Sequence, residues 1–278
     1  MRPAVVIGCG GGGCNIVSRL DPHKIRVATI NTGSSGSEAT VSLAGREVPG
    51  CRGDPGLGWA LASDYRKEIE ALVAGCSAVI VVAGLGGGTG AGAVPIVAEC
   101  AKTHGAKTIS VVSIPMGFEV ERRKRAFSQL KEVLRASDRA LVMDMDRLKD
   151  AGGGALPIHA AVSMTDELMA LAIARLAGAL DGPFDSTFDE RAYTLAFARS
   201  KDPVKAVETA LSLPLYDTDA FHGKTIVSPD RPFSVADAEQ VHMLISGASG
   251  RIPDIAPHGS EGDGVMLFIP IPSHASSS

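Results

Sequence analysis

Two apolar runs in the N-terminal third of the chain are each followed directly by a cluster of glycines. The first run occupies residues 4–8 with glycines at 8–13, and the second occupies residues 78–83 with glycines at 84–92. An apolar run bounded by glycine is typical of a buried strand. A turn without side chains that opens a helix exposes backbone N–H groups to a phosphate. The pattern therefore predicts two phosphate-binding turns at the ends of two buried strands.

Other patterns surround these two strands with further elements. Three more apolar runs predict strands, at residues 26–30, 108–114 and 140–143. Apolar residues at helical spacing lie between the runs, for example Phe127, Leu130 and Leu134. Alternation of strands and helices predicts a parallel sheet that is covered on both faces. We expect residues 1–160 to form a Rossmann-like α/β nucleotide-binding domain.

A long apolar segment follows this domain. Ser163 or Thr165 can cap a helix there, and the segment is apolar nearly all round, which is typical of a helix buried between two bodies. We expect a long central helix over residues 161–181. Strand patterns at 193–198, 224–228 and 265–271 and helix patterns at 203–213 and 235–245 come after it. They predict a smaller C-terminal α+β domain over residues 182–273, with a disordered tail over 274–278.

Composition and charge exclude several classes of protein. With 45% hydrophobic and 21% charged residues and a formal net charge of −4, the chain is neither disordered nor a basic nucleic-acid binder. No apolar run reaches the length of a membrane span, so direct membrane insertion is not expected. Five cysteines, an odd number, predict reduced thiols in the cytoplasm. The chain lacks the paired cysteine or histidine motifs of a metal site held by protein ligands.

Two common nucleotide motifs fit the glycine clusters poorly. Gly8, Gly10 and Gly13 match the dinucleotide pattern, but a dinucleotide site also needs an acid at the end of the second strand, where this chain has Asn31. Neither cluster contains the lysine of a P-loop. An NAD-dependent oxidoreductase is therefore the less favoured alternative.

The second cluster, residues 84–93, resembles the signature of the tubulin/FtsZ superfamily and is most similar to its FtsZ branch. The resemblance covers residues 3–180 well and the remainder loosely. It implies a site for GTP or GDP, with Mg²⁺ between the phosphates, in a pocket at a subunit interface. It also implies that residues 53–58 form a shortened third loop that faces the γ-phosphate. The nucleotide-binding residues that it implies in the two clusters are Gly10, Gly11, Gly12, Gly13, Cys14, Asn15, Gly86, Gly87, Gly88, Thr89 and Gly90.

The same resemblance assigns residues to the nucleoside. Glu119 would hold the ribose with Arg123 nearby, and Asp166 would accept hydrogen bonds from guanine. The family usually stacks an aromatic ring on the guanine, where this chain has Val162, and a family asparagine is replaced within residues 143–146. Phosphate binding is therefore better supported than selectivity for guanine.

The largest departure from the family follows the central helix. FtsZ proteins carry there an acidic loop and another helix, and the loop enters the next subunit's pocket to position the hydrolytic water. Residues 181–192 are too few for both, since one helical turn alone takes about 3.6 residues. Glu190 is the candidate displaced catalytic carboxylate, with Asp185 and Asp189 as substitutes. A solvated acidic linker is the favoured interpretation.

We therefore expect an FtsZ-like protein that binds guanine nucleotide and self-associates in a nucleotide-linked manner, in a cytoskeletal or cell-division role, with weak or absent hydrolysis. An active GTPase that uses Glu190 or a partner subunit's residue is the alternative. The expected partner is a second copy or another FtsZ-like protein, and the expected location is the cytoplasm.

Overall fold

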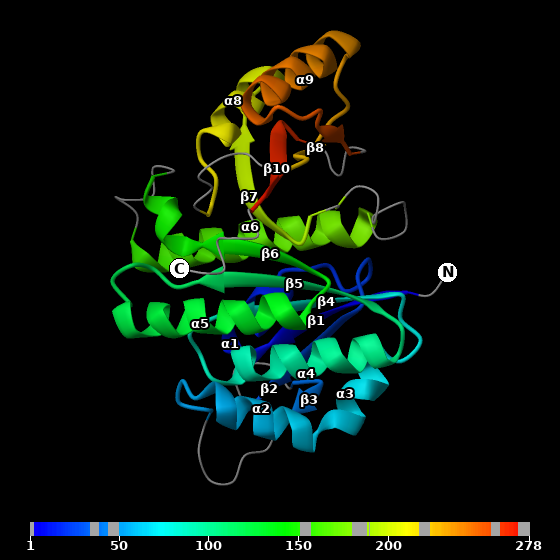
Figure 1. Ribbon diagram of the computed structural model, residues 1–278, viewed down its shortest axis with the longest axis vertical. Helices are drawn as coiled ribbons and strands as arrows, with labels where there is room; N and C mark the ends of the chain where they lie inside the picture. Colours follow the sequence, from blue (N-terminus) through cyan, green and yellow to red (C-terminus); the bar gives the residue numbers. More distant parts are fainter. Residues whose placement is uncertain are drawn as a thin grey trace.

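The computed structural model describes residues 3–33, 39–43, 50–150, 157–179, 188, 190–216, 223–256 and 262–271. Their strands form a single sheet in the order β3-β2-β1-β4-β5-β6-β7-β10-β8-β9, with helices on both sides (Figure 1). The strands are β1 Ala4–Cys9, β2 Val27–Asn31, β3 Val41–Ser42, β4 Ala78–Gly84, β5 Lys107–Ile114, β6 Arg139–Asp144, β7 Ala192–Arg199, β8 Ile226–Pro229, β9 Asp254–Ile255 and β10 Gly264–Pro270. The helices are α1 Gly10–Val17, α2 Pro55–Asp64, α3 Arg66–Val73, α4 Thr89–Thr103, α5 Val120–Ala136, the 3₁₀ helix η1 Met145–Lys149, α6 Ile158–Ala179, α8 Pro203–Leu211 and α9 Val235–Ser249.

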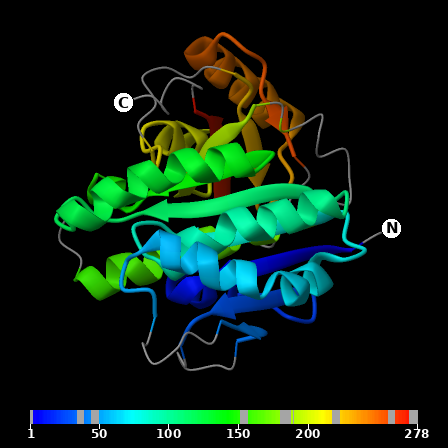
Figure 2. The same ribbon diagram turned by 60° about the horizontal axis from the view of Figure 1, so that its bottom comes forward.

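The strands from β3 to β7 are all parallel, as the alternation of elements predicts. Successive side chains of a strand point to opposite faces, so an apolar run fills two cores at once. In β4, Val79 and Val81 join the core under α3, α4 and α5. Ile80 and Val82 join the opposite core, under α1 and α6. Figure 2 shows α2 and α3 outside α4, as a further layer on that side of the sheet.

The central helix begins earlier than its sequence predicts. It starts at Ile158, and the carbonyl of Pro157 accepts hydrogen bonds from the N–H groups of Ala160 and Ala161. Proline is well suited to the start of a helix, because its fixed φ is already helical. Thr165 lies inside the helix, where its hydroxyl donates to the carbonyl of Ala161. The prediction of a cap at Ser163 or Thr165 was therefore wrong.

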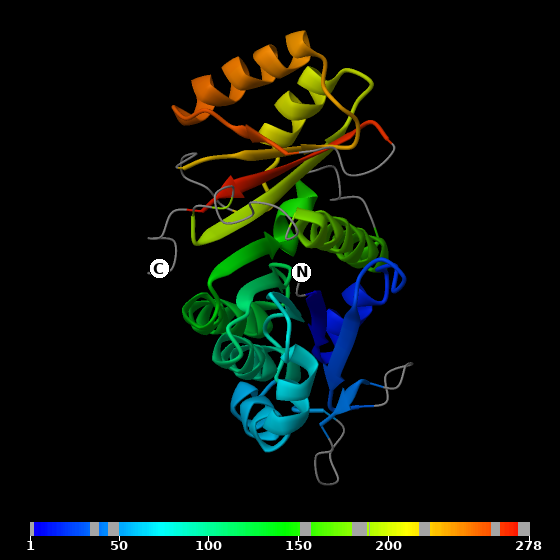
Figure 3. The same cartoon turned by 90° about the vertical axis from the view of Figure 1, so that its right-hand side faces the viewer.

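The C-terminal elements match the predicted strands and helices but do not form a separate sheet. Residues 192–194 of β7 pair with residues 140–142 of β6, and the rest of β7 continues outward to pair with β10. Hydrogen-bonded strand pairing therefore continues without a break from the parallel strands into the C-terminal strands. Figure 3 shows α8 and α9 above the outer strands, with α6 between this part and the parallel strands β1 to β6. Besides the central helix α6, the strand β7 therefore also connects the two parts of the molecule.

Several predicted segments lie outside the described residues. They are the tail, residues 274–278, and most of the acidic linker, including Asp185 and Asp189. Within the described ranges, no helix is both long and apolar enough to cross a membrane.

Candidate functional site

The two glycine clusters lie side by side at the carboxyl ends of neighbouring strands. β1 and β4 pair along their whole length, so the turns that follow them meet at one edge of the sheet. A Cβ atom added to Gly10 would lie 2.7 Å from the backbone nitrogen of Gly90, and one added to Gly90 would lie 2.7 Å from the carbonyl oxygen of Cys9. Side chains at either position would push the two turns apart. The convergence that the sequence predicts is present.

The helices that follow these clusters begin without a side-chain cap. Cys9 and Gly88 precede α1 and α4 and make no capping hydrogen bond, and neither helix has an acid in its first turn. In the described part of the chain, nothing accepts a hydrogen bond from the backbone N–H of Gly88. Uncapped helix starts with free N–H groups favour an anion. The residues present therefore fit the phosphates of a nucleotide.

The third predicted loop has a different character. Residues 55–58 form the first turn of α2, and the carboxylate of Asp54 accepts hydrogen bonds from the N–H groups of Gly56 and Leu57. This helix start is already satisfied by its own chain. Of the shortened third loop expected at residues 53–58, the part from Pro55 onward is helical.

The glycines divide into two groups by what surrounds them. Gly11 and Gly12 are exposed, and a Cβ atom on Gly11 would meet nothing within 4 Å. Gly13 instead packs against the backbone of Val82, and a Cβ atom on Gly88 would lie 2.5 Å from that of Cys51. The first group leaves room for a ligand, whereas the second lets backbone segments approach one another.

Thr89 lies at the junction of three segments. Its side chain is buried, and its hydroxyl lies 2.9 Å from the hydroxyl of Thr32 and 3.3 Å from the sulfur of Cys51. These contacts tie the second cluster to the segment after β2 and to the segment before α2. Sequence reasoning missed Cys51, because nothing in the sequence indicates that it meets a residue 38 positions away.

The cysteines of the first cluster are thiols. Burial raises the pKa of Cys14 to about 11, and its sulfur donates a long hydrogen bond to the carbonyl of Gly8. Burial also raises the pKa of Cys9 far above its ordinary value. Asn15 is exposed beside them. The described residues contain no group of three or more side chains that could hold a metal ion.

The predicted ribose residues lie at the start of α5, at the same edge of the sheet. Glu119 precedes the helix and forms an ion pair of 2.7 Å with Arg122. Arg123 donates two hydrogen bonds of 2.6 Å to the carboxylate of Asp144, at the end of β6, and a third to the carbonyl of Pro115. Arg123 thus joins the ends of β5 and β6, a role that local sequence does not reveal.

Asp166 faces the end of α1 from the third turn of α6. Its carboxylate lies 3.5 Å from the guanidinium of Arg19, and only 14% of its side chain is exposed. Burial raises the pKa of Asp166, although the charge of Arg19 opposes part of the shift. A largely buried carboxylate at this place can accept hydrogen bonds from a ligand. Sequence reasoning missed Arg19, which follows α1.

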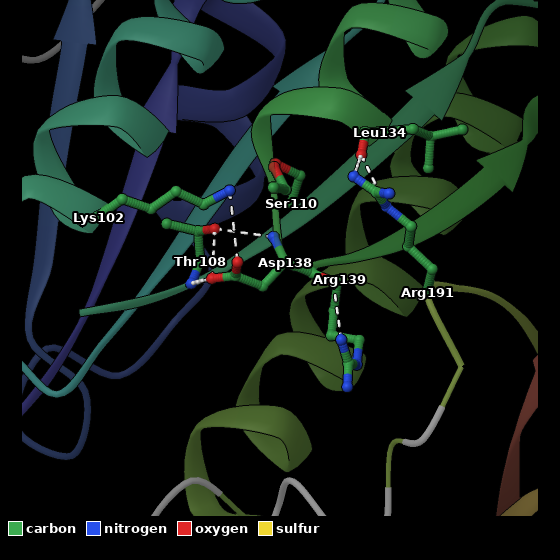
Figure 4. A network of polar contacts seen from close by, with 8 residues as sticks. Lys102, Thr108, Ser110, Leu134, Asp138, Arg139 and Arg191 are labelled. Carbon is green, nitrogen blue, oxygen red and sulfur yellow. Dashed lines mark hydrogen bonds and ion pairs between the residues drawn. The ribbon is translucent and has the colours of Figure 1, made fainter. Parts of the chain in front are cut away.

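Glu190 lies at the amino ends of the parallel strands, opposite the carboxyl ends where the glycine clusters lie. It precedes β7, and its backbone N–H donates to the hydroxyl of Tyr193. The amino ends of β5 and β6 lie at this edge and are joined by a polar network around Asp138, which accepts from the N–H and hydroxyl of Thr108 (Figure 4). A parallel strand of six residues spans roughly 20 Å. Glu190 is therefore not brought together with the glycine clusters of its own chain.

Comparisons with known proteins agree with this architecture. The profile of the "Tubulin/FtsZ family, GTPase domain" matches residues 21–153. "Cell division protein FtsZ 1" of Pyrococcus horikoshii is 33% identical over 238 residues, which are 77% of this chain and 64% of that protein. The protein of the same name from Thermococcus kodakarensis is 30% identical over 267 residues, 87% of this chain and 71% of that protein. The chain thus spans about two thirds of the length of these relatives.

Solved structures extend the likeness to the C-terminal half. "FtsZ dimer, empty" from M. jannaschii has a TM-score of 0.82 and 26% identity, and the match covers 97% of this chain and 88% of that one. CetZ from Methanosaeta thermophila has a TM-score of 0.76 at 18% identity, which supports the fold alone. Identity and coverage together show that the chain belongs to the tubulin/FtsZ family.

Proposed function

We propose that this protein binds GTP or GDP at the two glycine clusters and self-associates in a nucleotide-linked manner, in a cytoskeletal or cell-division role in the cytoplasm. The single observation that carries the proposal is the contact between two uncapped helix starts at the ends of β1 and β4. Polyphosphate is the ligand that such a pair of turns accommodates best. The match to the GTPase domain of the family supports the same assignment.

The rest of the nucleotide follows from the residues around the phosphates. Gly11 and Gly12 would face the phosphates because they are exposed, and Gly88 would do so because its N–H lacks an acceptor in the described chain. Mg²⁺ would be held mainly by phosphate oxygens, since the described residues provide no ligand cluster for it.

The nucleoside would extend from the phosphates toward two acidic side chains. Glu119 would lie at the ribose, near Arg123, and Asp166 would accept hydrogen bonds from the N–H donors of guanine. The partial burial of Asp166 supports this role, because hydrogen bonds to a charged group gain strength where water is excluded.

The NAD-dependent alternative loses support at β2. Asn31, at the end of that strand, is buried, and its side-chain oxygen accepts a hydrogen bond from the N–H of Thr32. No acid is present there to hold a ribose as dinucleotide sites do. Absence of NAD(H) binding in a titration closes this alternative.

The position of Glu190 leaves two hypotheses about GTP hydrolysis. In the favoured version, turnover is weak or absent and nucleotide controls assembly alone. In the other, Glu190 of one copy acts on nucleotide in the next copy, because it lies at the opposite edge of the sheet from the clusters of its own chain. A second FtsZ-like protein could supply the same residue type.

Nucleotide content tests the central proposal. Purified protein is expected to release guanine nucleotide on denaturation and to bind added GDP in a titration. Gly11→Leu should abolish binding without unfolding the protein, because its side chain would enter the open space in front of the clusters. Gly247→Leu, at an equally open position on α9, is the matched control. Wild-type protein that neither carries nor binds guanine nucleotide would refute the proposal.

A mixing experiment tests hydrolysis. Phosphate release is measured for Gly11→Leu, for Glu190→Ala and for their mixture. If Glu190 acts between copies, each variant alone is inactive and the mixture regains activity, since one supplies the nucleotide and the other the carboxylate. Turnover that is negligible for wild type at every protein concentration supports the version without hydrolysis.

A further inference from the structure

A buried glutamine on α5 forms hydrogen bonds with the backbone of the second glycine cluster. Gln129 lies on the stripe of α5 that faces the sheet, together with Ala126, Leu130 and Val133. Only 7% of its surface is exposed. A polar side chain in an apolar stripe is unfavourable unless its hydrogen bonds are satisfied. Its partners therefore explain why it is there.

Both hydrogen bonds of this side chain go to consecutive glycines of the cluster. The backbone N–H of Gly86 donates to Oε1 of Gln129 at 2.5 Å, and Nε2 of Gln129 donates to the carbonyl of Gly87 at 2.9 Å. Gly86 has a φ of +82°, in the left-handed region, and a Cβ atom there would clash with the backbone of Arg122. The cluster thus rests directly on α5.

These two bonds decide which backbone groups remain free. They engage the N–H of Gly86 and the carbonyl of Gly87, on the side of the cluster that faces α5. Among the described residues, the N–H of Gly88 has no acceptor. A glycine-rich segment has many accessible backbone conformations, so an external support is needed to keep this donor in one direction.

We propose that Gln129 is a positioning residue that orients the N–H of Gly88 toward the phosphates of the bound nucleotide. The inference rests on the proposed nucleotide binding and adds a specific requirement to it. A primary amide suits this task because one planar group accepts from an N–H and donates to a carbonyl. A methionine of similar length would fill the same space and make neither bond.

Three variants test the proposal by GDP titration. Gln129→Met removes both hydrogen bonds and should weaken GDP binding on the order of tenfold, since each net bond is worth about 1 kcal/mol. Leu130→Met changes the neighbouring core residue without touching the cluster and should leave GDP affinity unchanged. All measurements are made well below the melting temperatures of the variants, so that every protein is folded.

Gln129→Glu adds a readout that a merely structural role would not change. At neutral pH its carboxylate can accept from Gly86 but cannot donate to Gly87, so GDP affinity should fall. As pH falls through the pKa of the new carboxyl, its O–H can donate again, and affinity relative to wild type at the same pH should recover. The charged side chains that contact Gly86 are Arg122 and Arg125, and both stay cationic throughout. Gln129→Met should show no recovery.

The outcomes separate this inference from the proposed function. GDP affinity of Gln129→Met equal to that of Leu130→Met, or identical behaviour of the Met and Glu variants at every pH, would overturn the positioning role. If wild-type protein binds no GDP, the proposed function fails, and hydrogen exchange then decides the inference. Exchange at residues 86–89 should be faster in Gln129→Met, and unchanged exchange would refute it.

Discussion

Gly92 is where the packing between α2 and α4 leaves no room for a side chain. A Cβ atom there would lie 2.6 Å from the carbonyl carbon of Gly58 and would also clash with the backbone of Pro55 and Trp59. Carbon atoms in contact are normally about 3.5–4.0 Å apart. Because all three obstacles are backbone atoms of α2, no rotamer change can relieve them. Gly92→Ala should therefore force α2 to retreat by about 1 Å.

The size of the effect follows from two opposing terms. Overpacking of this kind costs about 1–3 kcal/mol of unfolding free energy. Alanine in a helix interior regains about 1 kcal/mol over glycine. Gly247→Ala, in α9, receives only the second term, because a Cβ atom there meets nothing within 4 Å. The difference between the two variants therefore isolates the packing term.

Urea unfolding of both variants measures this difference. Gly247→Ala should be more stable than wild type, and Gly92→Ala should lie about 1–3 kcal/mol below Gly247→Ala. GDP affinity should fall in Gly92→Ala as well, because Cys51, just before α2, contacts Thr89. Equal unfolding free energies for the two variants would refute the reasoning that this glycine exists for close packing.

Three further predictions concern charged side chains. Asp166→Asn should weaken GDP binding at least tenfold, since a hydrogen bond to a charged group is worth about 1.5–3 kcal/mol. Because burial raises the pKa of Asp166, lowering the pH should protonate its carboxylate and weaken GDP binding at a higher pH than an ordinary aspartate would; a GDP titration across acidic pH checks both statements. Asp144→Asn should lower the melting temperature and the GDP affinity together, because the amide keeps one acceptor oxygen, no charge and a donor that opposes Arg123; thermal unfolding with and without GDP measures this. Arg175→Met should cost about 3–5 kcal/mol in urea unfolding, because it breaks the buried ion pair with the carboxylate of Asp230, which is only 9% exposed.

Local pattern predicted the half that contains the two glycine clusters well. Apolar runs bounded by glycine placed β1 and β4, and helical spacing placed α5, because burial on both faces leaves a direct trace in residue order. The positions of the two glycine clusters followed from the same runs. The start of α6 was wrong because Pro157 and Ser163 both fit a helix start, and local sequence does not rank them.

The sequence by itself therefore determined the strands, the order of the elements and the two glycine clusters, since these depend on near neighbours in the chain. Only the tertiary structure decided which distant groups meet. It brought Gly10 to Gly90, joined Arg123 to Asp144 and seated Gln129 behind the cluster. It also placed Glu190 beside the amino ends of the parallel strands, away from the glycine clusters at their carboxyl ends. The physical reason is that contacts between residues tens of positions apart depend on how whole strands and helices pack, which no local pattern records.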